Sequence, residues 1–148
     1  MRDLVNNQVL VAALLGWIIA QTLKLPIYYL KYKRWNWALW FAAGGMPSSH
    51  SSLISATTLA CGLYEGFGSP VFALAFAVAM VILYDAAGVR RQAGLHAQRI
   101  NHLIEEIFSG HPITQDRLKE VLGHTPREVL VGMLLGIVIA IFLKFIWP

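Results

Sequence analysis

The chain has 148 residues, of which 57% are hydrophobic and only 14% are charged, and its formal net charge at pH 7 is +4. This composition and a mean hydropathy of +0.57 exclude an ordinary soluble domain, in which about a quarter of the residues are charged. The length allows about four to six membrane spans of roughly 20 residues, so we expect a single membrane domain over residues 1–148.

Four apolar segments predict an all-α integral membrane protein, a bundle of four transmembrane helices over residues 4–23, 49–65, 70–89 and 128–147. A secretory signal is the alternative for the first segment, but it has only Arg2 as a basic leader and no small-residue cleavage site after it, which favours a mature helix. A turn rich in Gly and Pro separates the second and third segments. The single cysteine, Cys61, cannot form an intrachain disulfide.

Residues 28–46, between the first two segments, combine basic side chains with Trp35, Trp37 and Trp40. Aromatic rings settle at headgroup depth, and basic side chains extend from there to water. The apolar run in this stretch is short for a span. We therefore interpret it as a short re-entrant or interfacial half-helix, with a tilted fifth span as the alternative.

Residues 90–127 form the polar part of the chain, which we expect on the cytoplasmic side. Apolar residues recur at helical spacing over residues 100–108 and predict an amphipathic helix. A second short helix is expected to begin at Thr114 and to end before Gly123. Three histidines lie here at no familiar metal-ligand spacing, so surface positions are expected for them: His102, His111 and His124.

Lysine and arginine concentrate in residues 24–34 and 90–127, and the turn over residues 65–70 has none. By the positive-inside rule, both basic connections face the cytoplasm and both chain ends face outward. We expect an integral protein of the bacterial cytoplasmic membrane. Topology and attraction to anionic headgroups explain the positive charge, so nucleic acid is not expected as a partner.

The sequence Pro47-Ser48-Ser49-His50 stands at the start of the second apolar segment. A helix start carries unpaired N–H groups and partial positive charge, which favours an anion such as phosphate. His50 adds a group that can transfer a proton near neutral pH. The alternative interpretation is a helix cap, because Ser is a preferred N-cap residue and Pro suits the first turn.

The predicted topology brings Asp85, Arg90 and Arg91, at the end of the third segment, to the same membrane face. A charge within a span costs about 2.5 to 3.5 kcal/mol at mid-membrane, so Asp85 needs a partner. Arg90, Arg91, His50 and His96 are the candidates. The pairing would either lock helix ends together or orient a catalytic group.

These motifs resemble the divergent, short branch of the type-2 phosphatidic acid phosphatase family, which is related to vanadium haloperoxidases and bacterial acid phosphatases. The wider family has Lys-x6-Arg-Pro, then Pro-Ser-Gly-His, then Ser-Arg-x5-His-x3-Asp. Residues 47–50 match the second motif with Ser49 in place of Gly, and Arg90-x5-His96 matches the core of the third. Lys24-x6-Lys31 is a degraded first motif.

The third motif departs from the family pattern, since Val89 stands in place of Ser and Ile100 in place of Asp. The resemblance implies that His96 attacks phosphorus and that His50 protonates the departing lipid oxygen. Asp85 or Asn101 would then have to orient the imidazole. The implied phosphate-binding residues are Arg90 as the main clamp, with Arg91, Lys24, Ser48 and Ser49.

The expected function is therefore a membrane lipid-phosphate phosphatase that hydrolyses a phosphomonoester such as phosphatidate, phosphatidylglycerophosphate or a polyprenyl phosphate. No cofactor and no protein-bound metal are expected; the partners are the lipid phosphate substrate and membrane lipids, and a homo-oligomer is left open. The alternative is a non-catalytic lipid- or anion-binding membrane protein of the same fold. A small multidrug-type transporter is disfavoured, because the polar 90–127 segment does not suit four closely packed spans of that kind.

Overall fold

A computed structural model describes residues 4, 6–41, 44–107 and 123–148, apart from the side chains of residues 90, 91 and 106. All regular structure in this part of the chain is helical, as the four apolar segments predicted. One 3-10 turn and five α-helices follow one another: α2 (Gln8–Tyr32), η1 (Trp37–Trp40), α3 (Ser49–Glu65), α4 (Pro70–Ala87), α5 (Val89–Ile107) and α6 (Pro126–Ile146).

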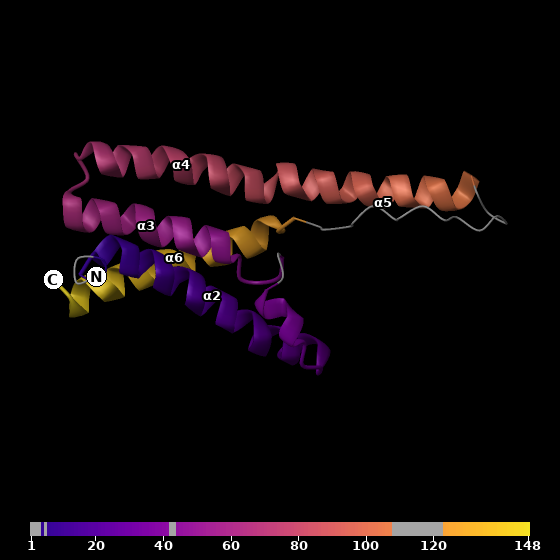
Figure 1. The fold of residues 1–148 in the computed structure, drawn as a ribbon, viewed down its shortest axis with the longest axis horizontal. Helices are drawn as coiled ribbons and strands as arrows, with labels where there is room; N and C mark the ends of the chain where they lie inside the picture. Colours follow the sequence, from indigo (N-terminus) through magenta and orange to yellow (C-terminus); the bar gives the residue numbers. More distant parts are fainter. Residues whose placement is uncertain (1–3, 5, 42–43, 108–122) are drawn as a thin grey trace.

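Helix α3 lies at the centre of the bundle, packed on α2, α4 and α6 (Figure 1). Helices α3 and α6 run in the same direction, and α2 and α4 run in the opposite one. The start of α2 and the end of α6 therefore meet at one end of the bundle. The end of α2, the starts of α3 and α6 and the end of α4 meet at the other, which we call the polar end.

Small residues allow α3 to occupy this central position. A Cβ atom at Gly136 would overlap the Ser52 carbonyl oxygen, and one at Gly16 would lie 3.0 Å from it. The Ser52 hydroxyl donates a hydrogen bond of 2.9 Å to the Gly16 carbonyl oxygen. Close backbone approach and buried hydroxyl bonds of this kind are typical of helix packing in membranes.

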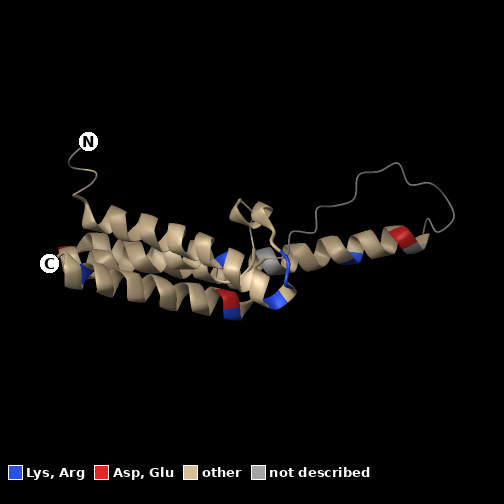
Figure 2. Cartoon of the chain, turned by 90° about the horizontal axis from the view of Figure 1, so that it is seen from below, with Lys and Arg blue, Asp and Glu red and all other residues tan. Residues whose placement is uncertain are grey.

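Three stretches of the described chain are long and apolar enough to cross a membrane: Gln8–Tyr32, Pro70–Glu105 and Pro126–Ile146. Helix α3, with 17 residues, is shorter and richer in serine. The structure thus supports an all-helical membrane fold with three candidate spans. Figure 2 shows that the charged residues of the described part of the chain are confined to the ends of the bundle and to α5.

The half-helix expected over residues 28–46 is not one continuous element. Helix α2 continues past Pro26 to Tyr32 and ends where Lys33 adopts a left-handed conformation, with φ of 54°. Within the described part of the remaining range, only the η1 turn is helical. The side-chain amide of Gln21 donates to the Trp40 carbonyl oxygen and holds this turn against α2. This hydrogen bond joins residues far apart in the chain, so the sequence could not reveal it. The structure therefore has a short turn held against α2 where we expected a separate half-helix.

Helix α5 follows α4 after Gly88 and continues nearly in line with it beyond the polar end (Figure 1). Among the described elements, α5 contacts α4 alone. The short helix expected from Thr114 and the residue His111 lie outside the described residues.

Candidate functional site

Ser48 anchors the start of α3 at the polar end. Its side-chain oxygen accepts hydrogen bonds from the Ser51 N–H at 3.3 Å and from the Ser51 hydroxyl at 2.9 Å. Its own N–H donates to the Glu128 carbonyl oxygen at 3.1 Å. Ser48 is fully buried, so the cap interpretation of its side chain is confirmed. Its hydroxyl and the Ser51 N–H are engaged in the cap, and the partial positive charge at the start of α3 favours an anion nearby.

The start of α6 pairs an imidazole with a carboxylate. Nδ1 of His124 lies 3.3 Å from Oε2 of Glu128, and the same oxygen accepts the Thr125 N–H at 2.9 Å. The Thr125 hydroxyl accepts the Glu128 N–H and completes a capping box. Because the carboxylate accepts a hydrogen bond from Nδ1–H, the lone pair of the neutral ring is assigned to Nε2.

His124 is buried, with 6% of its surface exposed, so the expectation of a surface histidine is wrong here. Burial is the largest influence on the pKa of His124 and lowers it, while the hydrogen bond and charge of Glu128 act in the opposite direction. Positive charge on Lys24 and His50 lowers the pKa again. The net shift is downward, which favours a neutral imidazole at neutral pH.

Lys24, on α2, places a cation near the His124 and Glu128 pair. Its side chain is buried, with 2% exposed, and it lines a hollow of about 280 Å³ together with Glu128, Lys31 and Gly45. This volume is close to the lower end of ligand pockets, about 300 Å³. The hollow is lined by two lysines and one carboxylate, and this net positive charge suits an anionic ligand.

His50 lies in the first turn of α3 and is exposed. Its charge acts on the imidazole of His124, as does that of Lys24. The structure therefore gathers residues from three helices at the polar end: Lys24, His50, His124 and Glu128. Among the residues that the structure describes, no cluster of three His, Cys, Asp or Glu side chains is arranged to hold a metal ion.

The remaining residues proposed from the sequence lie on α4 and α5. Asp85 is half-buried near the end of α4, and the backbones of Arg90 and Arg91 form the first turn of α5, next to the polar end. His96 lies further along α5 and is exposed, whereas Asn101, on the same helix, is buried. Because α5 contacts none of α2, α3 and α6, the structure does not bring His96 together with His50.

A family model described as the divergent PAP2 family matches residues 5–139 of this chain. The chain belongs to the divergent PAP2 family. A membrane protein of Bacillus subtilis (strain 168), YuiD, described as uncharacterized, is 35% identical over 97% of this chain and 98% of its own length. No solved structure matches. The resemblance inferred from the motifs is thereby confirmed.

One motif of this divergent PAP2 chain was not recognised from its sequence. His124 and Glu128 have the His-x3-Asp spacing of the family's third motif, with Glu in place of Asp. The pair stands at the start of α6, far along the chain from Arg90, so the spacing from the arginine did not reveal it. The Thr125 and Glu128 capping box, followed by an apolar run, was the local pattern that could have drawn attention to it.

Proposed function

We propose that this divergent PAP2 protein is a membrane lipid-phosphate phosphatase, with its active site at the polar end. The observation that carries the proposal is the His124 and Glu128 pair beside Lys24 and His50. Binding an anion requires cations and N–H donors only. An imidazole held by a carboxylate, with a second imidazole nearby, is the arrangement that nucleophilic and acid–base catalysis requires.

In the proposed first step, the Nε2 lone pair of His124 attacks phosphorus in line with the lipid oxygen. The P–N bond forms as the P–O bond to the lipid breaks, and the His50 imidazolium gives its proton to the departing oxygen. Glu128 stabilises the positive charge that develops on the ring of His124. Lys24 and the partial positive charge at the start of α3 offset the charge on the phosphoryl oxygens.

In the second step, the neutral His50 accepts a proton from water while the water oxygen attacks phosphorus. The P–N bond breaks, inorganic phosphate leaves, and both histidines return to their starting states. We retain Arg90 and Arg91 as guanidinium clamps on the phosphate. Ser49, in the first turn of α3, is retained as a phosphate-binding residue, and Asp85, near the end of α4, as an orienting group. The placement of His96 on α5 favours His124 as the attacking group.

The proposal includes four spans, with α3 crossing the membrane inside the bundle, and a polar end that faces the cytoplasm of a bacterial cell. Support for this orientation comes from the basic residues at 24–34 and 90–127. The substrate would be a phosphomonoester of the phosphatidate, phosphatidylglycerophosphate or polyprenyl phosphate type. A site at headgroup depth suits each of them.

The test is phosphate release from these three lipid phosphates by purified protein in detergent. His50→Ala and His124→Ala should each lower turnover by about 10² to 10⁴, and His96→Ala serves as the matched control and should retain turnover. If His96→Ala alone is inactive, the nucleophile is His96. If the parent protein binds lipid phosphate and releases no phosphate, the non-catalytic alternative is correct.

A further inference from the structure

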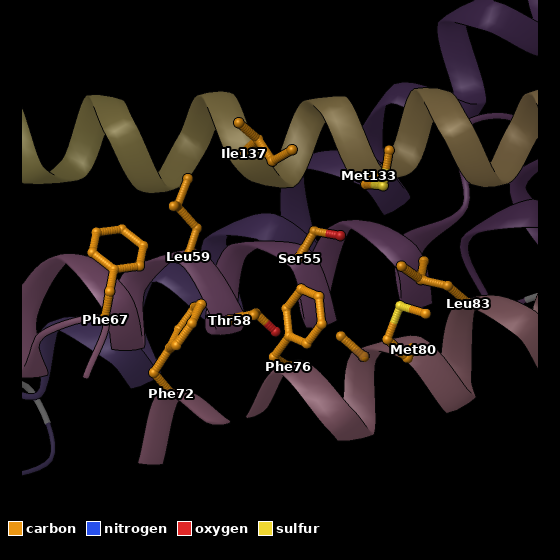
Figure 3. A pocket seen from close by; sticks show the side chains of 11 residues that line it. Ser55, Thr58, Leu59, Phe67, Phe72, Phe76, Met80, Leu83, Met133 and Ile137 are labelled. Atoms are coloured by element: carbon orange, nitrogen blue, oxygen red, sulfur yellow. The ribbon is translucent and has the colours of Figure 1, made fainter. Parts of the chain in front are cut away.

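An apolar groove runs along the bundle between α4 and α6, with α3 as its floor (Figure 3). Its volume is about 300 Å³. Figure 3 shows Phe76 and Met80 of α4 pointing across toward Met133 and Ile137 of α6. The groove exists because α4 and α6 each pack closely on α3 and contact one another at few positions.

The walls of the groove are almost free of polar groups. Two hydroxyls contribute to the lining, those of Ser55 and Thr58. The Thr58 hydroxyl donates a hydrogen bond of 2.8 Å to the Ile54 carbonyl oxygen of its own helix. It also lies 3.2 Å from the Ala75 carbonyl oxygen. An apolar groove of this kind offers too few polar partners for ordered water, so a ligand that fits it is apolar.

The groove begins next to the polar end and extends away from it. Leu83, at its near end, lies two residues before Asp85, and Met133 follows Gly132, at which a Cβ atom would overlap the Ser48 carbonyl oxygen. Phe67 and Phe72, whose rings contact one another, line the far end. From Phe72 to Leu83 the helix rises about 16 Å, at about 1.5 Å per residue. This is close to half of the roughly 30 Å hydrocarbon core of a bilayer.

We propose that this groove binds one hydrocarbon chain of the lipid whose phosphate lies at the polar end. The identity of the headgroup rests on the proposed function, but the groove itself does not. A neighbouring transmembrane helix is a poor occupant, because helices pack in membranes through small residues. Apart from Ser55, Thr58 and Ala79, the lining residues are Phe, Met, Leu and Ile. Methionine side chains such as Met80 and Met133 are flexible and adapt to a chain of variable shape.

The first test is photo-crosslinking of the full-length protein in detergent with a phosphatidate that carries a diazirine midway along one acyl chain. We expect labelling on Phe76, Met80 and Met133, and competition by unlabelled phosphatidate in preference to phosphatidylcholine. Equal labelling of Leu134 and Phe142, which are exposed on the outer face of α6, would overturn the proposal. Equal competition by phosphatidylcholine would also overturn it, because the groove would then bind lipid without regard to the polar end.

The second test fills the groove. Met133→Trp should reduce the crosslinking yield, and should lower kcat/KM for long-chain phosphatidate by on the order of tenfold while sparing a short-chain soluble phosphatidate. Leu134→Trp is the matched control, since that side chain is 52% exposed and does not line the groove. An equal loss on both substrates, with an unchanged crosslinking yield, would refute the assignment.

Different results would refute the lipid-phosphatase proposal and the chain-binding proposal. Specific labelling of the groove without any phosphate release would retain the chain-binding site and exclude the phosphatase. Phosphate release that depends on His124, with labelling spread over all lipid-facing helices, would retain the phosphatase and exclude the groove as the site for the chain.

Discussion

Glu128 performs two tasks that can be separated by a single substitution to glutamine. Its Oε2 accepts the Thr125 N–H at 2.9 Å and lies 3.3 Å from Nδ1 of His124. In Glu128→Gln, the amide oxygen can still accept the Thr125 N–H, because a capping box forms with Gln as well as with Glu. The negative charge that would stabilise the imidazolium is lost.

The expected effect on stability is small and the expected effect on turnover is large. Removing a negative charge from the first turn of a helix costs about 0.3 to 1 kcal/mol. If His124 needs the carboxylate to react, turnover should fall by about 10² to 10⁴. Thr125→Ala removes the cap, which costs about 0.5 to 2 kcal/mol, but leaves the His124 and Glu128 pair in place.

The two variants therefore form a matched pair with similar losses of stability and opposite effects on chemistry. Circular dichroism melts in detergent measure the stability, and phosphate release from phosphatidate at saturating substrate measures the turnover. Thr125→Ala should turn over substrate as the parent does. If both variants lose turnover in the same proportion, the carboxylate acts only through the helix, and the role proposed for the His124 and Glu128 pair is refuted.

Three further predictions concern the bundle and its titration. Gly136→Ala places a Cβ against the backbone of Ser52 and should lower the free energy of unfolding by about 1 to 3 kcal/mol, whereas Gly68→Ala, which meets nothing within 4 Å, should melt like the parent. Ser52→Ala removes the bond to the Gly16 carbonyl oxygen and should cost about 0.5 to 1.5 kcal/mol in the same assay. The folded-state pKa of His124 lies below its ordinary value of 6.5, so the unfolded chain takes up a proton first as the pH falls. The contribution of His124 to the free energy of unfolding should be fully present above pH 6.5 and should decline as the pH falls toward the lower folded-state pKa. In melts over the same pH range, the stability of His124→Gln should decline less than that of the parent.

Part of the candidate site follows from local sequence. Ser48 before an apolar run predicts a helix start, and the cap is present with the bonds that such a residue makes. The Gly and Pro turn between α3 and α4 predicts an antiparallel pair, which brings Asp85 and Arg90 toward the end at which α3 begins. These inferences depend on hydrogen bonds and turns within a few residues, and such interactions are encoded in short stretches of sequence.

The sequence by itself determined the class of protein, an all-helical membrane chain, because composition and apolar segment length control partitioning into a bilayer. Only the tertiary structure decided which polar side chains meet. His124 and Lys24 stand in stretches that suit surface positions equally well, and they become buried neighbours because close packing at Gly16, Gly132 and Gly136 aligns α2 and α6 on α3. Packing between helices depends on residues far apart in the chain, and spacing along the sequence does not contain it.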